Sequence, residues 1–403
     1  MNNTKIDSKP TEEVLASTDV LVVGAGIIGL AHAAIAHQAG FSVTVIERDH
    51  RAIGASIRNF GHACITAQHG ELYDLAQAGR RHWLDFASKA GFWALEAGAL
   101  VVAATELELQ LLREFSASRP VGQVRVLDAE EVRAKLGREN TDGIRGGAFL
   151  ADDLRVDPRT TVGTLASWLD RQENAEVHFN TAAVDFTFGT TRRARVKTSR
   201  GIYETDHVFI CVGHDVDYLF PEVALEHKIT RCSLQMAAAA APESTTIIPA
   251  VLTATSMLRY DAFTRMPSAP RLRIHMESQR PDLLDIGANV MFTQRPDGTM
   301  LLGDSHSYEL TQPPFLSEST TDTLLDAAAK VLDVERFTLT ERWQGIYASS
   351  DVAPLLVKEI SESVTLVSVT SGIGMTVSFG LAEANLNAML PAGASRRSTS
   401  QVS

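Results

Sequence analysis

The chain has 403 residues, enough for about two domains, and its 45% hydrophobic and 21% charged residues are typical of a globular protein. A formal net charge of −12 argues against a nucleic-acid partner, which needs a basic face, and no apolar run reaches the roughly 20 residues that span a bilayer. Residues 1–18 lack the basic start and apolar core of a secretory signal, and the three cysteines lack metal-ligand spacing, so we expect a cytoplasmic protein without a metal site.

A glycine-rich turn follows an apolar strand in segment 19–30. Gly24 permits the tight turn, Gly26 lets the backbone approach a pyrophosphate, and Gly29 lets the next helix, expected over residues 27–39, pack closely on the sheet. The helix N-terminus offers unpaired N–H groups and its positive dipole end to a diphosphate. The dinucleotide contacts predicted here are Gly24, Gly26, Ile27, Ile28 and Gly29.

An acidic residue ends the second predicted strand. Glu47 follows Gly29 by 18 residues, where its carboxylate can accept hydrogen bonds from both ribose hydroxyls of an adenosine. A 2′-phosphate is disfavoured there, so the pattern fits FAD or NAD and not NADP. We assign the adjacent Arg48 to the same site.

Helical periodicity and helix-start signals recur further along the chain. Asp128 followed by Glu131 resembles a capping box, and Asp157 precedes Pro158 in a first helical turn. The helices predicted in this way cover residues 70–90, 106–115, 128–136, 157–169 and 319–332.

Short apolar runs bounded by turn residues predict strands. The buried strand 207–213 returns to cofactor-type sequence far beyond the first glycine turn, as in a cofactor domain interrupted by an insertion. Between residues 228 and 340 strands dominate, with a hairpin signal at Arg295–Gly298, and indicate a second, largely antiparallel unit. The predicted strands cover residues 177–180, 196–198, 202–203, 207–213, 229–238, 271–275, 289–294, 299–303 and 363–370.

A second glycine turn, Gly372-Ile-Gly374-Met-Thr376, again joins a strand to a helix. No acidic residue follows at ribose distance, so this is not a second nucleotide fold. Its helix N-terminus could face the electron-rich end of a flavin ring, where a dipole stabilises negative charge. An ordinary C-terminal turn is the alternative interpretation.

Together with segments Gly54–Gly61 and Cys211–Gly213, these motifs resemble those of the flavoprotein family of D-amino-acid, glycine and sarcosine oxidases, from Asp19 to about Met389. The resemblance implies FAD as the cofactor and an α/β fold: a Rossmann-like FAD-binding domain built from discontinuous segments, plus a substrate domain with a mainly antiparallel sheet. It also implies FAD contacts at Ser56, Arg58, Asn59, Gly213, Gly372, Gly374, Met375 and Thr376, and a backbone contact of Val184 with the adenine half.

We therefore expect a discontinuous domain organisation. The FAD-binding domain is expected to comprise residues 18–82, 150–220 and 341–391, and the substrate domain residues 83–149 and 221–340. The terminal segments 1–17 and 392–403 are expected to be disordered.

Four shorter motifs are similar to a subgroup of FAD-dependent oxidoreductases linked to aminoalkylphosphonate breakdown: Arg58–Gly61, Gly303–His306, Arg342–Tyr347 and Ser371–Thr376. The implied substrate is N-methylated 2-aminoethylphosphonate, oxidised by hydride transfer to flavin N5 and hydrolysis of the imine to phosphonoacetaldehyde and amine. Glycine, sarcosine or a D-amino acid is the alternative substrate.

Two positions depart from the sarcosine-oxidase pattern. Leu301 aligns with the lysine that those enzymes place beside flavin N5 for oxygen activation, so the acceptor is either oxygen or another compound. No cysteine lies near Ser349, the position of their covalent flavin link, so we expect noncovalent FAD.

An anionic substrate group needs cationic and hydrogen-bonding partners in a desolvated pocket. For each candidate a structural role is the competing interpretation, and Gln294 is a weaker candidate. The candidates for substrate contact are His306, Tyr347, Arg342, Trp343, Arg259 and His62.

Two other function classes stay open. A nicotinamide-dependent dehydrogenase would share the first motif but does not explain the returns at Gly213 and Gly372. A flavin-bound noncatalytic subunit would hold FAD without turnover. A monomer and a homodimer are both compatible with the sequence.

Overall fold

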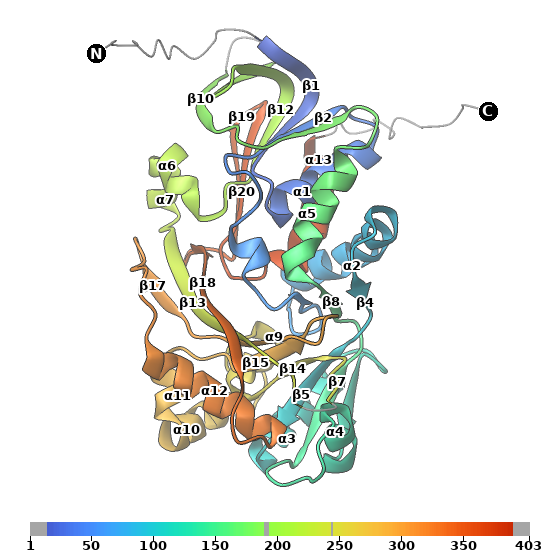
Figure 1. Ribbon diagram of the computed structural model, residues 1–403, viewed down its shortest axis with the longest axis vertical. Coiled ribbons are helices and arrows are strands. Elements are labelled where there is room, and N and C mark those ends of the chain that lie inside the picture. The colour runs from blue at the N-terminus through green and yellow to red at the C-terminus, as the bar shows by residue number, and fades with distance from the viewer. Residues whose placement is uncertain (1–13, 189–192, 243–244, 390–403) are drawn as a thin grey trace, which may run out of the picture.

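The computed structural model describes residues 14–188, 193–242 and 245–389. Two large sheets follow one another along the long axis of the molecule, the first at the top of Figure 1 and the second below it. A small three-stranded sheet, made of β3 (His62–Ala63), β8 (Leu154–Val156) and β4 (Ala94–Leu95), lies between them. The mixed α/β architecture agrees with the fold class expected from the sequence.

The first sheet has a parallel centre with antiparallel additions. Strands β9, β2, β1, β12 and β20 run parallel, in that order. Its strands are β1 (Val14–Val23), β2 (Val43–Ile46), β9 (Ala175–His178), β10 (Ala183–Thr187), β11 (Ala194–Thr198), β12 (Ile202–Ile210), β19 (Leu355–Ser361) and β20 (Val364–Val369).

Both faces of this sheet are buried, as the nearly continuous apolar strands require. In β1, Val20 and Val22 pack in a core with the helices α1 (Ile27–Gln38) and α13 (Gly374–Met389), while Leu21 and Val23 enter a separate core on the opposite face. Helix α13 packs between α1 and α2 (Glu71–Ala90). The glycine turn before α1 is thereby held at the carboxyl edge of the sheet.

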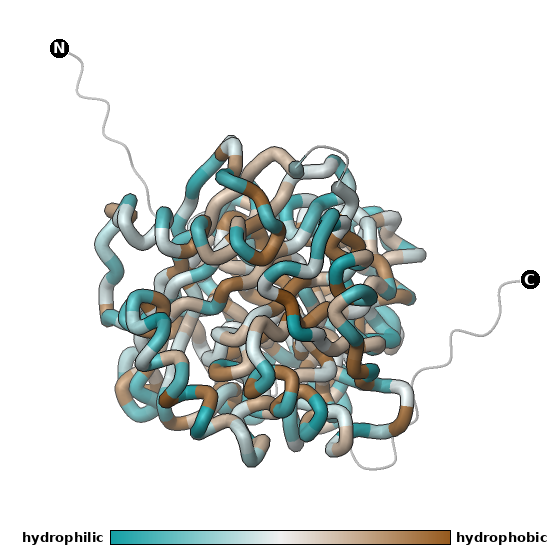
Figure 2. Tube along the Cα trace, turned by 90° about the horizontal axis from the view of Figure 1, so that it is seen from below, coloured by the Kyte–Doolittle hydropathy of each residue, from teal (hydrophilic) through white to brown (hydrophobic). Residues whose placement is uncertain are grey.

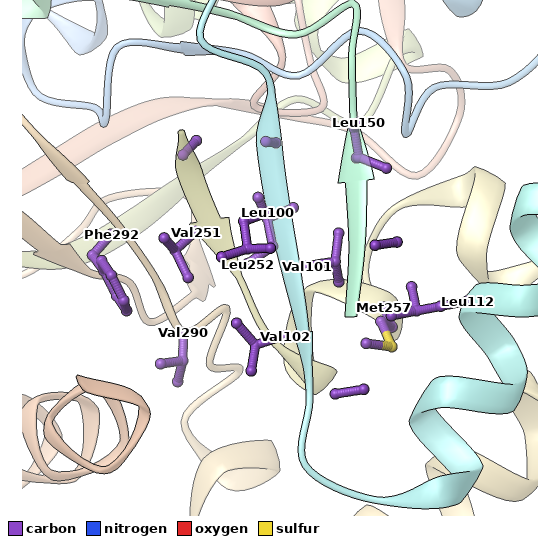
Figure 3. Close-up of a cluster of buried hydrophobic side chains, with 14 of the residues drawn as sticks. Leu100, Val101, Val102, Leu112, Leu150, Val251, Leu252, Met257, Val290 and Phe292 are labelled. Carbon is purple, nitrogen blue, oxygen red and sulfur yellow. The ribbon is translucent and has the colours of Figure 1, made fainter. Parts of the chain in front are cut away.

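The second sheet is mainly antiparallel, with one parallel pair, β5 and β14. Figure 3 shows the apolar side chains around these two strands, including Leu100, Val251 and Leu252, which are fully buried. Its strands are β5 (Ala99–Ala103), β6 (Val124–Leu127), β7 (Gly146–Leu150), β13 (Thr230–Ala239), β14 (Ala250–Leu252), β15 (Met291–Gln294), β16 (Met300–Gly303), β17 (Ser307–Glu309) and β18 (Leu339–Ser349).

The five helices predicted from periodicity and start signals are all present, as is the helix expected over residues 27–39. Asp128 and Glu131 form the predicted capping box, and Asp157 caps a helix that begins at Pro158. The remaining helices are α3 (Glu106–Ala117), α4 (Ala129–Leu136), α5 (Pro158–Leu169), α6 (Val216–Leu219), α7 (Pro221–Glu226), α8 (Ala254–Met257), α9 (Asp261–Thr264), α10 (Ala269–Gln279), α11 (Pro281–Asp285) and α12 (Glu318–Leu332).

One predicted strand is wrong. Residues 271–275 lie inside helix α10. The alternation of Leu272 and Ile274 with polar residues resembles a strand, but Ile274 is exposed and the buried partner of Leu272 is Met276, one helical turn later. Pro270 in the first turn supports the helix start because its missing N–H would have no helical partner there.

Two expected boundaries also differ. Residues 14–17 were expected to be disordered but belong to β1, where Ser17 pairs with Glu204. Strand β18 pairs along its length with β13, so residues 341–349 belong to the second sheet, although the expected FAD-binding segment 341–391 includes them. Residues 1–13 and the predicted disordered tail 392–403 lie outside the described residues.

Among the described residues, no helix is both long and apolar enough to cross a membrane. In Figure 2, hydrophobic and hydrophilic stretches alternate along the trace, as expected of helices and strands that each bury one face.

Candidate active site

A cavity of about 450 Å³ lies where the two sheets meet. The first sheet contributes the carboxyl ends of its parallel strands, including Val23, Ile46 and Val369, and the second contributes Leu234 and Met291. The crevice beyond the carboxyl ends of parallel strands is where open α/β sheets bind ligands. One continuous cavity therefore connects the predicted dinucleotide motif with the second sheet.

The first glycine turn is closed by backbone contacts that leave no room for side chains. A Cβ on Gly24, whose φ is +105°, would lie 2.5 Å from the carbonyl oxygen of Cys211. A Cβ on Gly29 would lie 1.9 Å from the carbonyl oxygen of Gly24. Gly24, Gly26, Ile27 and Ile28 line the cavity, whereas Gly29 lies behind it and lets α1 pack on the turn.

The backbone fixes the Glu47 carboxylate at the end of β2. Its Oε2 accepts a hydrogen bond from the Ala25 N–H (2.8 Å), and its Oε1 accepts one from the Asp49 N–H (3.0 Å). Glu47 lines the cavity beside Arg48, whose guanidinium lies 2.7 Å from an Asp215 carboxylate oxygen. An acidic acceptor is thus held at the position that the sequence predicts for a ribose.

Segment 54–61 forms the cavity wall facing the start of α1. Ser56 Oγ accepts a hydrogen bond from the Ile27 N–H (2.9 Å). Asn59 donates through Nδ2 to the Ala55 carbonyl (2.9 Å), and its Oδ1 accepts from the Gly61 N–H (2.8 Å). Arg58 lines the cavity and donates to the Gln344 carbonyl of β18 (3.2 Å), which joins this wall to the second sheet.

The second glycine turn packs against an aromatic ring from the second sheet. Gly372 has a φ of +76°, and a Cβ there would lie 2.9 Å from Cζ of Tyr347. Gly374 begins α13, and Thr376 Oγ1 accepts a hydrogen bond from the Cys64 N–H (3.0 Å). The N-terminus of a long helix therefore borders the cavity where the two sheets meet.

These features fit an extended dinucleotide cofactor, because side chains are excluded where its backbone cradle must be and an anchored carboxylate stands at its predicted ribose end. Val184 does not line the cavity and is 55% exposed on β10, while its neighbours Ala182 and Ala183 do line it. The predicted cofactor residues that line the cavity are Gly24, Gly26, Ile27, Ile28, Glu47, Arg48, Ser56, Arg58, Asn59, Gly213, Gly372, Gly374, Met375 and Thr376.

A cation lines the cavity beside a strand of the second sheet. Arg259, which follows helix α8, donates from Nη2 to the Tyr347 hydroxyl (2.9 Å), and both residues line the cavity. Within the described ranges, no carboxylate oxygen lies within 4.0 Å of its guanidinium nitrogens. Burial raises the pKa of Tyr347 well above its ordinary value, which keeps the phenol protonated. Arg259 is thus a cavity cation without a close carboxylate partner.

His306 and Asp304 line the same cavity near Arg259 and Tyr347. Nδ1 of His306 donates to the Gly287 carbonyl (2.8 Å), and its ring lies 6.4 Å from the Tyr347 ring. Burial and the nearby Arg259 lower the pKa of His306 well below its ordinary value, so the imidazole is neutral. Burial raises the pKa of Asp304 to about 7, against the opposing effects of Arg259 and Asn289. Asp304 was not predicted, although it stands two residues before His306 in a motif that the sequence singles out.

Other predicted residues lie outside the cavity. Arg342 forms an ion pair with the exposed Glu318, and Trp343 donates to the Arg58 carbonyl (3.3 Å) from behind the cavity wall. Gln294 hydrogen-bonds the backbone of Ile247 and Gly298, which lie outside the strands of the second sheet. Leu301 is fully buried among apolar side chains and does not border the cavity.

His62 lines the cavity and is tied to a buried carboxylate. Its Nε2 lies 2.8 Å from Asp153 Oδ2, while Asp153 Oδ1 accepts a hydrogen bond from the Thr66 N–H (2.8 Å). His62, Asp153 and Cys64 bring potential metal-ligating atoms within 4.8 Å of one another, a grouping that the sequence does not reveal. Asp153 thus accepts two hydrogen bonds, while Nδ1 of His62 is buried without a hydrogen-bond partner among the described residues.

Comparison with known proteins gives the family. Residues 19–385 match the model of the family described as DAO: FAD dependent oxidoreductase. No curated protein matches the chain in sequence.

Three solved structures share the fold. Glycine oxidase from Geobacillus kaustophilus is 18% identical, with a TM-score of 0.73, and the alignment covers 94% of this chain and 96% of that one. Iminodiacetate oxidase from Chelativorans sp. BNC1 is 17% identical, with a TM-score of 0.69 and coverages of 94% and 97%. L-alpha-glycerophosphate oxidase from Mycoplasma pneumoniae, solved with FAD bound, is 17% identical, with a TM-score of 0.70 and coverages of 92% and 94%. With the family match spanning most of the chain, this protein belongs to the DAO family of FAD-dependent oxidoreductases.

Proposed function

We propose that this flavoenzyme oxidises the C–N bond of a small amine that carries an anionic group, and that the preferred substrate is N-methylated 2-aminoethylphosphonate. The observation that carries the proposal is Arg259, which lines the cavity without a close carboxylate partner among the described residues. A guanidinium in a cavity binds a phosphonate or carboxylate through charge-assisted hydrogen bonds. The neighbouring Tyr347 hydroxyl supplies a further donor.

The protein's part in the reaction is to bind, orient and shield the substrate. Bound FAD supplies the hydride acceptor, its N5 atom. Arg259 and Tyr347 hold the anionic group at the end of the cavity, and Tyr347 packs against Gly372 at the start of the second glycine turn. This arrangement orients the C–N carbon toward the border between the two sheets. Loss of a hydride from that carbon leaves an iminium ion, which water hydrolyses to an aldehyde and an amine.

Two arguments support N-methylated 2-aminoethylphosphonate as the substrate. The four short motifs resemble those of the aminoalkylphosphonate subgroup, and two of them supply Asp304, His306 and Tyr347 to the cavity. The broader alternative is a carboxylate-bearing amine such as glycine, sarcosine or a D-amino acid. It is favoured by the fold shared with a glycine oxidase and an iminodiacetate oxidase. In both hypotheses Arg259 binds the anionic group of the substrate.

We further propose that FAD is held noncovalently and that Arg48 and Glu47 bind its adenosine end. The second half-reaction delivers electrons to oxygen or to another acceptor. Leu301, the residue aligned with the oxygen-activating lysine of sarcosine oxidases, is buried away from the cavity, so any reaction with oxygen proceeds without that lysine.

The first test is anaerobic bleaching of the flavin absorbance by glycine, sarcosine, D-alanine, 2-aminoethylphosphonate and its N-methyl derivatives, followed by admission of air. Fast bleaching by the N-methylated phosphonate alone supports N-methylated 2-aminoethylphosphonate as the substrate. Bleaching by glycine or D-alanine assigns the enzyme to the carboxylate-bearing alternative. Failure of every amine to bleach the flavin contradicts the proposal and favours a noncatalytic flavin subunit.

The second test compares two arginines. Replacing Arg259 with Met removes the cavity cation and should raise the KM for an anionic amine by roughly 10- to 150-fold, the equivalent of about 1.5–3 kcal/mol for a charged hydrogen bond. Arg342→Met removes the same charge outside the cavity and should change the KM less than about threefold, within the small contribution of an exposed ion pair. A larger effect of Arg342→Met than of Arg259→Met would move the anion site to β18.

A further inference from the structure

We infer that Asp304 is the group that takes the proton from the substrate ammonium before the C–N bond is oxidised. The inference rests on the proposed function, because it names a residue for a step that amine oxidation requires. An ammonium has no free electron pair on nitrogen, so it must lose a proton before the neighbouring carbon can release a hydride. In this step the N–H bond breaks, its electron pair stays on nitrogen, and a new O–H bond forms on Asp304.

The placement of Asp304 suits this role. It lines the cavity with Arg259 and Tyr347, and its side chain is buried, with only 4% of the residue exposed. Its backbone is fixed on both sides by Asn289, which accepts from the Asp304 N–H (2.9 Å) and donates its own N–H to the Asp304 carbonyl (2.8 Å). The main chain that carries the carboxyl group is thus fixed beside the cavity.

One oxygen of this carboxyl group has no partner within the described part of the chain. Oδ1 of Asp304 is buried and accepts no hydrogen bond there, whereas Oδ2 lies 3.9 Å from Nε2 of His306. A buried polar atom without a partner costs free energy unless a ligand supplies one. A substrate ammonium would supply a hydrogen bond and a compensating charge.

The alternative base, His306, is disfavoured by its surroundings. Its Nδ1 donates to the Gly287 carbonyl. If the ring took up a proton, its positive charge would lie near that of Arg259. The opposite holds for Asp304, because Arg259 stabilises its ionised form. A carboxylate next to the anion site therefore fits proton removal better than the imidazole does.

The electrostatics allow the proton to move. Burial raises the pKa of Asp304 to about 7, while Arg259 and Asn289 act in the opposite direction. Other groups coupled to Asp304 are Tyr260 and Cys232. Next to the buried Asp304, a neutral amine beside a neutral acid is favoured over an ammonium beside a carboxylate, because burial penalises both charges.

The test uses Asp304→Asn, which keeps the size of the side chain and removes its titration, in the flavin-loaded protein. The probe is the panel amine that bleaches the wild-type flavin fastest. In the wild type, kcat/KM should rise with pH through an apparent pKa near 7. In the variant, kcat/KM at pH 7 should fall by roughly 100-fold or more, as expected for loss of a general base. It should recover as the pH approaches the pKa of the free amine, about 10, because the substrate then arrives neutral.

A binding measurement separates proton removal from anion binding. Ethylphosphonate has the anionic group but no amine, and its binding is followed by the change in flavin absorbance. Asp304→Asn should leave its dissociation constant within about twofold of the wild-type value, because Arg259 still binds the anion. Asp285→Asn, which removes an exposed carboxylate outside the cavity, is the matched control and should keep the wild-type pH profile.

The outcomes are distinct. An unchanged pH profile in Asp304→Asn, or an equal loss at every pH together with weakened ethylphosphonate binding, overturns the role of Asp304 and leaves the proposed function standing. If none of the amines in the panel bleaches the wild-type flavin, the proposed function fails and the role of Asp304 fails with it. If Asp304→Asn does not retain flavin, the variant Asp304→Glu is measured instead. Its kcat/KM should still rise with pH, through a shifted apparent pKa. Absence of that rise would overturn the assignment of Asp304.

Discussion

The roles of some single residues in the cavity can be predicted from the sequence, and those of others cannot. Glu47 is predictable because its distance from the glycine turn is set by a local strand-helix-strand unit. Arg259 and Arg342 are equally plausible in the sequence, since each is an arginine near a tyrosine or tryptophan. Only the fold separates them: Arg259 lines the cavity, and Arg342 pairs with Glu318 on the outside of β18.

At this scale we predict the effect of removing the Glu47 carboxylate. Glu47→Ala loses the acceptor of the Ala25 and Asp49 N–H groups and the predicted ribose contact. FAD retention should weaken by roughly 1.5–3 kcal/mol, the range for a hydrogen bond to a charged group. The measurement is flavin content after dialysis. Glu176→Ala removes an exposed carboxylate from the adjacent β9 and serves as the control; equal flavin loss in both variants would contradict the role of Glu47.

Among elements, helices with local start signals were predicted more securely than short strands. The capping box at Asp128 and the Asp157–Pro158 start are complete within a few residues, so they do not depend on distant partners. The segment 271–275 is preceded by Pro270, a helix-start signal, but its two-residue alternation resembles a strand and is ambiguous over so short a length. Its helical state is decided by burial of Leu272 and Met276 against the rest of the second unit.

The element scale also yields a stability prediction. Asp128→Ala removes the side-chain acceptor for the Glu131 N–H at the start of α4. The free energy of unfolding should fall by about 0.5–2 kcal/mol, and flavin content should stay unchanged because α4 lies outside the cavity. A urea titration gives the stability, with Glu130→Ala in the same helix as the control. A loss of flavin in Asp128→Ala would show that this helix is coupled to the cofactor site.

The whole molecule is organised around the meeting of distant segments. The cavity walls come from the start of the chain, from residues near 211–215, from the second sheet, and from the C-terminal turn before α13. A ligand that contacts all of them stabilises the folded state alone, because no such site exists in the unfolded chain.

We therefore predict that FAD raises the thermal stability of the apoprotein. At a concentration 100 times the dissociation constant, binding contributes about 2.7 kcal/mol, and the unfolding midpoint should rise by roughly 3 °C. Differential scanning calorimetry of the flavin-stripped and reconstituted protein measures the shift. NADP is the control ligand, because its 2′-phosphate would meet the Glu47 carboxylate. A shift of the same size with NADP would contradict the predicted selectivity of the ribose end.

Local chemistry determined what the sequence could establish by itself: the glycine turn with its acidic partner, the helices with complete caps, and the hairpin at Arg295–Gly298. These depend on steric and hydrogen-bonding preferences within short stretches of chain. The tertiary structure decided which polar residues share the cavity. Asp304 and Arg259 come together through the pairing of distant strands, and their burial sets their charge. Because desolvation depends on what surrounds a group rather than on its neighbours in sequence, no local pattern could distinguish Arg259 from Arg342.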